Sequence, residues 1–188
     1  NGTEPMQYQW RRDGVAVGSG SSSSFAIQGA VEGNSGTYDV VVSNGTGSVS
    51  AAGVSVQVVS PVNLTQQPVS PVVAIAGGTF VLNVVASGLP APQYQWRRGG
   101  VAIGGATSAE LRIVNAQASD GGVYDVVVAN SLGSVVSTAS QVQVLTPPTI
   151  NVPLVGGTVL LGGTFVLNVG ANGTEPMQYQ WRRDGVAV

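Results

Sequence analysis

Few side chains in this chain of 188 residues could carry out chemistry. The sequence has no histidine, no cysteine and no lysine, so its seven cationic side chains are all arginines. The usual general base, the thiol nucleophile and the Schiff-base amine are therefore absent. Zinc sites built from Cys and His are excluded, and the nine carboxylates are scattered, with no Asp-rich loop of the kind that binds calcium. We expect no enzyme activity, no cofactor and no metal.

Six of the seven arginines form adjacent pairs, and each pair closes the string YQWRR. Paired arginines can bind an anion such as phosphate. The favoured alternative is a cross-strand ion pair in which Arg97 faces Asp125 on the neighbouring strand, as Arg11 faces Asp39. We therefore predict a structural role for these four side chains.

Overall charge argues against two classes of partner. A net charge of −2 with only 9% charged residues lacks the basic surface that nucleic acid requires. No apolar run approaches the length of about eighteen residues that a membrane-spanning helix needs. We expect neither nucleic-acid binding nor membrane insertion in this segment.

The sequence repeats itself. Residues Asn172–Val188 are letter for letter the same as Asn1–Val17, at an offset of 171 residues. Inside this unit lies a shorter period, because Trp10, Trp96 and Trp181 are 86 and 85 residues apart. Each unit is thus two related modules, and we expect the chain to be a window from a longer tandem array.

The pattern within one module predicts short strands. Apolar residues alternate with polar ones over several runs, which Gly and Pro separate, and no window of twelve residues keeps a helical period free of both. Two upstream runs, separated by Pro68 and Pro71, read as a split edge strand. The expected strands are Val62–Gln67, Val72–Ala76, Phe80–Ser87, Glu110–Val114, Val123–Ala129 and Ser134–Leu145. This pattern is typical of an all-β sandwich.

A set of spaced motifs in the middle module resembles an immunoglobulin domain of the intermediate set. The motifs are Leu82-x-Val84, Gly88-x-Pro90-x-Pro92, Trp96, Leu111-x-Ile113, Asp120-x-Gly122-x-Tyr124-x-Val126 and Asn130-x-x-Gly133. The resemblance implies an all-β chain of tandem immunoglobulin-like β-sandwiches with a 171-residue, two-domain repeat. It departs from the family at both cysteine positions, which hold valine, so no disulfide can form.

The resemblance also implies which residues build the core. Tryptophan lies in the core of such domains rather than on a sugar-stacking surface, and the tyrosine hydroxyl bonds to upstream backbone in a tyrosine corner. The residues concerned are the tryptophans Trp10, Trp96 and Trp181, the valines Val40, Val84, Val126 and Val169, and the tyrosines Tyr38 and Tyr124. Cysteine-free modules of this kind look like those of large bacterial surface and secreted proteins.

The motifs divide the chain into three parts. Residues 1–58 carry strands C to G of one module, residues 59–145 a complete module, and residues 146–188 strands A to C′ of the next. Two explanations of the partial modules stay open: the chain is continuous with further repeats, or separate chains complete each other by donating strands.

These observations favour a structural function. We expect a repeat of a long extracellular or cell-surface protein that forms a fibre, stalk or sheath and whose partners are copies of itself. A surface with few charges makes lateral association into filaments plausible. The alternatives are a spacer array in a cell-surface adhesin and an accessory module of a large secreted enzyme.

Overall fold

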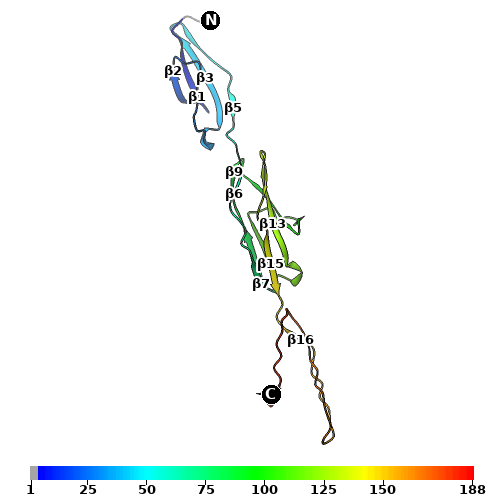
Figure 1. The fold of residues 1–188 in the computed structure, drawn as a ribbon. Coiled ribbons are helices and arrows are strands. Elements are labelled where there is room, and N and C mark those ends of the chain that lie inside the picture. The colour runs from blue at the N-terminus through cyan, green and yellow to red at the C-terminus, as the bar shows by residue number, and fades with distance from the viewer. Residues whose placement is uncertain (1–3) are drawn as a thin grey trace. The chain divides into compact units, whose positions relative to one another are not determined.

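A computed structural model of the chain describes residues 4–188 (Figure 1). Within that range the regular elements are β-strands, apart from the 3-10 turns η1 (Glu32–Asn34) and η2 (Ala118–Asp120). The predicted all-β class is confirmed. The chain forms two compact units: one holds the residues up to Asn63 together with Ser87–Pro92 and Ala129–Gly133, and the other holds the rest. The boundaries predicted at residues 58/59 and 145/146 stay predictions.

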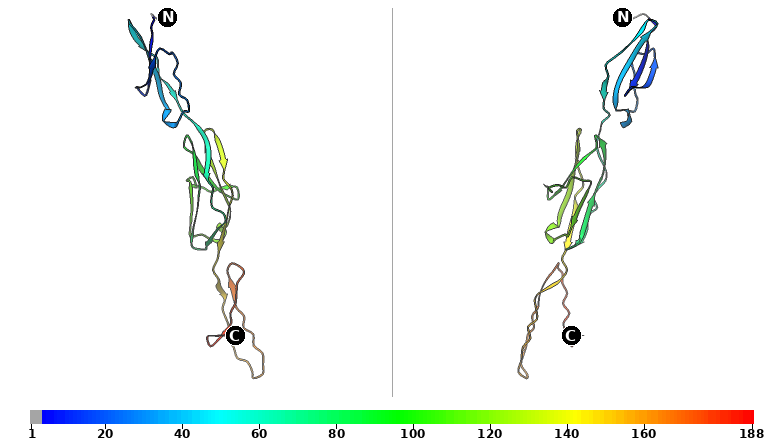
Figure 2. Two further views of the ribbon diagram at one scale, coloured as in Figure 1. Left: turned by 60° about the vertical axis from the view of Figure 1, so that its left-hand side comes forward. Right: turned by 180° about the vertical axis from the view of Figure 1, so that it is seen from behind.

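The N-terminal module is a single antiparallel sheet in the order β2-β1-β3-β4, with β5 also paired to β3 (Figures 1 and 2). Trp10 lies opposite Val40 in the register of β1 and β3, and Arg11 lies opposite Asp39. The strands are β1 (Gln7–Arg12), β2 (Val15–Gly20), β3 (Gly36–Asn44), β4 (Gly47–Ser50) and β5 (Val54–Val56). All the strands described within residues 4–58 belong to this sheet, so one of its faces has no second layer there.

The middle module has a main sheet in the order β11-β10-β13-β15-β7, with β14 also paired to β13. Its strands are β7 (Val72–Ile75), β10 (Gln93–Arg98), β11 (Val101–Ala102), β13 (Gly122–Asn130), β14 (Gly133–Val136) and β15 (Ser140–Leu145). Strand β7 runs parallel to β15, whereas β10 and β11 pair antiparallel. This sheet carries the Trp, Tyr and Arg side chains that the sequence singles out.

The remaining strands of this module pair among themselves. Strand β8 (Thr79–Asn83) pairs with β12 (Glu110–Val114), and β6 (Ser60–Gln66) pairs with β9 (Val85–Leu89). Alternate residues of β8 are buried, because Phe80 is 4% and Leu82 0% exposed while Thr79, Val81 and Asn83 are exposed. Side chains from both sets of strands thus form one core, as in a β-sandwich.

The predicted split edge strand is confirmed, as β6 and β7. The first half pairs with β9 and the second with β15, so the chain changes sheet between them. Pro68 and Pro71 lie at this crossing. Proline cannot donate a ladder hydrogen bond, so pairing with one sheet ends there and pairing with the other begins.

Two predicted strands are interrupted in the structure. The run Phe80–Ser87 changes partner at Val84, from β12 on one side to β6 on the other. The run Ser134–Leu145 is broken after β14, where the Ser137 hydroxyl accepts a hydrogen bond of 3.0 Å from the Val126 N–H. This hydroxyl takes a position that a backbone carbonyl would hold in a regular ladder, so the regular pairing is interrupted between β14 and β15.

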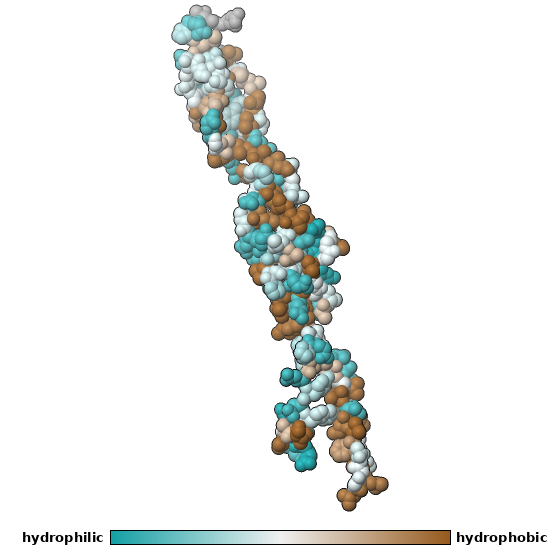
Figure 3. All heavy atoms as spheres, viewed as in Figure 1, coloured by the Kyte–Doolittle hydropathy of each residue, from teal (hydrophilic) through white to brown (hydrophobic). Residues whose placement is uncertain are grey.

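The C-terminal segment has little regular structure. Strand β16 (Thr149–Val152) pairs with β17 (Gly170–Asn172), and β18 (Arg182–Arg183) pairs with β19 (Val186–Ala187). Residues 153–169 form no strand, and their apolar side chains are exposed, as the brown surface after β16 shows (Figure 3). The exposed large residues there are Leu154, Val155, Val159, Leu160, Leu161, Phe165, Val166 and Leu167.

The predicted core residues are all buried in the middle module, whereas in the partial modules only Tyr38 is buried. Trp181 is 38% exposed, and Trp10, Val40 and Val169 are only partly buried. A sandwich core needs both sheets, and residues 4–58 supply strands of one sheet alone. These four side chains are less buried than their counterparts in the middle module, and their place in the core stays a prediction.

Truncating the middle tryptophan tests this difference. We expect Trp96→Ala to lower the free energy of unfolding by about 3–5 kcal/mol, because a fully buried aromatic leaves a cavity. Trp181→Ala is the matched control, and its cost should be much smaller because that ring is 38% exposed. Urea denaturation monitored by circular dichroism measures both. Equal costs for the two variants would contradict the burial described.

Candidate functional site

Trp96 is a core residue and not a binding platform. The side chain is 0% exposed, and its indole Nε1 donates a hydrogen bond of 2.9 Å to the carbonyl of Ser108. Val84 and Val126, at the two cysteine positions, are 3% and 0% exposed. No face of this indole is open to a sugar ring, so the structure excludes stacking at this position.

Both modules contain a tyrosine corner. The Tyr124 hydroxyl donates a hydrogen bond of 2.6 Å to the carbonyl of Asp120, and the Tyr38 hydroxyl donates one of 2.7 Å to the carbonyl of Asn34. The acceptor residues also cap the turn, since the Asp120 carboxylate accepts a hydrogen bond of 2.8 Å from the Gln117 N–H. Asp120 therefore fixes the corner through its side chain and its backbone, which is a structural role.

The structure brings each predicted Arg–Asp pair together. Arg97 binds Asp125 through two hydrogen bonds, Nε to Oδ1 at 2.7 Å and Nη2 to Oδ2 at 2.8 Å. Arg11 Nε lies 2.5 Å from Asp39 Oδ1. The hydrogen bond to Asp125 raises the pKa of Arg97, partial burial opposes this, and the carboxylate charge adds to it. Because the pKa of Arg97 is raised, the guanidinium is charged at neutral pH, and the stability that this charge contributes is lost as pH rises through the raised value.

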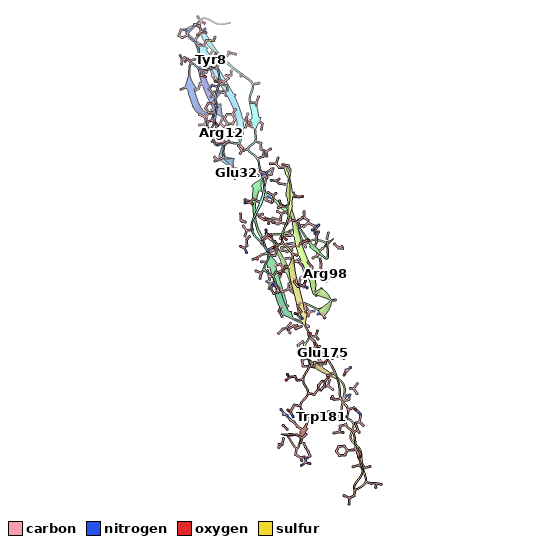
Figure 4. All side chains as sticks on the ribbon, viewed as in Figure 1. Tyr8, Arg12, Glu32, Arg98, Glu175 and Trp181 are labelled. Carbon is pink, nitrogen blue, oxygen red and sulfur yellow. The ribbon has the colours of Figure 1, made fainter. Side chains whose placement is uncertain are left out.

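In two of the three arginine pairs, the second arginine makes a structural contact that the sequence reasoning missed. Arg98 Nη1 donates a hydrogen bond of 2.9 Å to the Ser119 carbonyl and lies 3.5 Å from Asp120 Oδ1. Arg12 Nη1 donates in the same way to the Gly33 carbonyl. Figure 4 labels both arginines in their modules. The separation of 21 residues between donor and acceptor recurs in both modules, and this recurring spacing is the signal that could have revealed the contact.

A glycine accommodates each of these arginines. Gly36 has φ 155°, and a Cβ there would lie 2.9 Å from the Arg12 Cγ atom. Gly122 has φ 149°, with the Arg98 Cγ 3.6 Å from the Cβ position. Both glycines thus allow a positive φ, and Gly36 also leaves room for the Arg12 stem, whereas a Cβ at Gly122 would make only an ordinary contact with Arg98. The recurring charged residues of the modules serve the scaffold.

An apolar groove of about 290 Å³ lies in the N-terminal module. Its lining residues are Trp10, Phe25, Ile27, Ala30, Asn34, Tyr38, Val56 and Val58. Trp10 and Phe25 stack with their ring centroids 5.8 Å apart. The indole Nε1 of Trp10 is buried and has no hydrogen-bond partner in the described structure.

The structure offers no metal centre in the described range. Among residues 4–188, no group of three or more His, Cys, Asp or Glu side chains is arranged to hold a metal ion. No helix in that same range is long and apolar enough to cross a membrane.

Comparison with known proteins identifies the architecture. Residues 61–130 match the family model described as "Immunoglobulin domain". The chain is 32% identical over 191 residues to mouse hemicentin-2, which covers 95% of the chain and 4% of the relative. It is 32% identical over 132 residues to the neuronal-glial cell adhesion molecule of chicken, over 66% of the chain and 10% of the relative. The chain thus spans only a small part of these two relatives.

A solved structure shows the same fold. The I-band fragment I67–I69 of titin is similar over 100% of this chain and 72% of its own, with a TM-score of 0.67 and 20% sequence identity. The mouse and chicken relatives are animal proteins, so they give no support to the bacterial origin that the resemblance implied.

Removing one hydroxyl tests the tyrosine corner. We expect Tyr124→Phe to lower the free energy of unfolding by about 1 kcal/mol, because the Asp120 carbonyl loses its hydrogen bond from a buried side chain. Tyr94→Phe serves as the control, since Tyr94 is partly exposed and lies outside the corner. Thermal unfolding followed by calorimetry compares the two variants. An unchanged stability in Tyr124→Phe would remove the corner from the stabilising contacts.

The valine pair can be tested by restoring the bridge. We expect the double variant Val84→Cys with Val126→Cys to oxidise and to gain about 2–4 kcal/mol of stability, since both positions are buried where related domains carry a disulfide. Thiol titration and urea denaturation, with and without reductant, measure bond formation and the gain. Two free thiols after oxidation would show that the register assigned to the two valines is wrong.

Proposed function

Because this chain consists of tandem immunoglobulin-like domains without cysteines, we propose that it is a structural repeat of a long extracellular protein that forms a fibre, stalk or sheath. The side-chain contacts that recur once per module support this role most directly. The Arg–Asp pair, the arginine on the corner and the tyrosine corner occur in both modules. In the N-terminal and middle modules, these repeated polar side chains support the fold without a disulfide.

The junctions between modules suit a spacer. They are short and contain proline, as Ser60-Pro61 and Thr146-Pro147-Pro148. Proline fixes φ and removes a hydrogen-bond donor, so such junctions behave as semi-rigid spacers. We propose an array whose modules keep a preferred tilt at each junction.

A low surface charge supports association between arrays. Only 9% of the residues are charged, and the net charge is −2. Weak charge repulsion lets arrays approach one another. We propose copies of the same protein as its partners, in lateral association.

The second candidate function is a spacer in a cell-surface adhesin. The observation that favours it is the similarity to a protein whose name is neuronal-glial cell adhesion molecule. In that role the array would hold a distant binding domain away from a surface and would not associate laterally.

Electron microscopy of a purified chain of four to six modules distinguishes the two roles. Strands of about ten residues, rising roughly 3.3 Å per residue, give modules of some 35–40 Å, so a two-module unit spans about 70–80 Å. A fibre-forming protein should give filaments with an axial period near or below that span. Assembly should change little with salt, because few charges contribute. A monodisperse monomer at high concentration would favour the adhesin spacer instead.

A further inference from the structure

Two charged side chains of the middle module have no partner inside it. Residues 59–145 contain six charged residues, and four of them face each other in two Arg–Asp contacts. The remaining two, Glu110 and Arg112, lie two residues apart on the same face of β12, and both are exposed. Neither makes a hydrogen bond or an ion pair within residues 4–188. This strand therefore presents two opposite charges that the module itself does not use.

Strand β12 also has a free edge. It pairs with β8 alone, so its other side is not paired with any strand in the described structure. Such an edge presents unpaired backbone N–H and C=O groups to which another strand can bond. Both β8 and β12 lie well inside the chain, and all the strands of their module come from residues 60–145. The free edge is therefore a feature of the whole module and does not arise from the ends of the chain.

The ladder between β12 and β8 shows which backbone groups face the free edge. The Ala109 carbonyl accepts a hydrogen bond of 3.1 Å from the Val84 N–H, in the register that β12 and β8 share. Residues bonded to one neighbouring strand alternate along an antiparallel ladder. Leu111 therefore directs its backbone groups toward β8, whereas Glu110 and Arg112 direct theirs toward the free edge. The two residues with unused charges thus also carry the unused backbone groups.

The space beside this edge is open. A groove of about 320 Å³ is lined by the loop of residues 103–108 and by residues 110–113 of β12. The loop reads IGGATS, so it brings neither a charged residue nor a proline to the edge. Charged side chains and prolines are devices that keep edge strands of natural proteins from pairing with other chains. On the side of this loop, β12 has only its own two charges for that purpose.

These two charges favour one pairing between two copies of β12. When the strands pair antiparallel about Leu111, Glu110 of each copy lies opposite Arg112 of the other. Both residues face the free edge with their backbone groups, so the opposed residues can exchange hydrogen bonds and attract each other's charge. Moving the centre by one residue puts Glu110 opposite Glu110 or Arg112 opposite Arg112, and like charges directly opposite are destabilising. The charges therefore select the register and do not block the edge.

We propose that the free edge of β12 is the surface by which two copies of the chain associate side by side, as an antiparallel strand pair centred on Leu111. The partner is a second copy because the edge is complementary to itself, as a two-fold contact requires. Two Glu110–Arg112 pairs, one on each side of the centre, hold the copies in register. This inference rests on the lateral association proposed above and assigns a surface to it.

The contact is short, and repetition along an array strengthens it. At the 86-residue spacing of the first two tryptophans, Ser24 and Ala26 of the N-terminal module stand where Glu110 and Arg112 stand in the middle module. One of the two modules in each 171-residue unit therefore carries the charged edge. Several weak contacts on linked modules bind together more tightly than one contact alone. Arrays with more two-module units should therefore associate more tightly.

Charge reversal tests the surface and the register together. Sedimentation equilibrium of the 188-residue chain should show a dimer of 18.9 kDa subunits. Glu110→Arg places like charges at both cross-strand positions and should raise the dissociation constant at least about tenfold. Adding Arg112→Glu exchanges the two signs and should restore the original value. Glu32→Arg, at an exposed residue outside β12, changes the net charge equally and should have no effect. A monomer at all concentrations, or a loss that the double reversal does not restore, would overturn the proposal.

Amide hydrogen exchange tests the backbone pairing separately from the charges. The N–H groups of Glu110 and Arg112 face the free edge, so their exchange should slow about tenfold or more as the chain passes from monomer to dimer. The Leu111 N–H faces β8 and should exchange at the same rate in both states. Both charged residues are exposed, so their substitution puts no core contact of the module at risk. Unchanged exchange at Glu110 and Arg112 in the dimer would refute the strand pair.

Electron microscopy of longer arrays separates this inference from the proposed fibre role. We expect arrays in which every charged edge carries Glu110→Arg to form fewer filaments than unchanged arrays. Filaments that form equally well from both would contradict the assigned surface and leave the fibre role standing. A dimer of the 188-residue chain that Glu110→Arg weakens, together with arrays that form no filaments, would support the surface and remove the fibre role.

Discussion

Burial of one tryptophan between two sheets is the constraint on which the rest of each module depends. A single sheet has an apolar face that only a second layer can cover. Where both layers are present, Trp96 is 0% exposed and its Nε1 is satisfied by the Ser108 carbonyl. Where one layer is present, Trp10 is only partly buried and its Nε1 has no partner in the described structure. The burial of this tryptophan thus depends on whether both layers of its module are present.

Because the module has no disulfide, its stability depends more on contacts at the edges of the core. The tyrosine hydroxyl holds the turn before β13, and the arginine after the tryptophan holds the same turn from β10. The first arginine of the pair ties β10 to β13 through Asp125. Two of these contacts connect the strand carrying Trp96 to its neighbour and to the turn, and the third connects that neighbour to the same turn. Their counterparts recur in the N-terminal module.

The sequence predicts the fold class and much of the strand pattern because both depend on local periodicity and on spaced motifs. The alternation of apolar and polar residues predicted the strand Glu110–Val114, and the two prolines predicted the split edge strand. Alternation did not predict the break at Val84, because a change of partner strand leaves the apolar pattern intact. The Arg98 contact was missed because its acceptor is a backbone carbonyl. Every residue has such a carbonyl, so the residue types in the sequence do not identify the acceptor. Burial of Trp181 was expected from its motif, but exposure depends on strands that the motif does not contain.

The parallel pairing of β7 with β15 has a mechanical consequence. These are the strands by which the chain enters and leaves the main sheet of the middle module, and they are in register from Val72↔Val142 to Ile75↔Leu145. Because the strands are parallel, tension applied through the preceding and following chain pulls them in opposite directions along their length. The hydrogen bonds between them are loaded together in shear and do not open one after another as in a zipper. The short β7–β15 pairing therefore contributes to resistance against stretching, together with the β6–β9 pairing that precedes it in the chain.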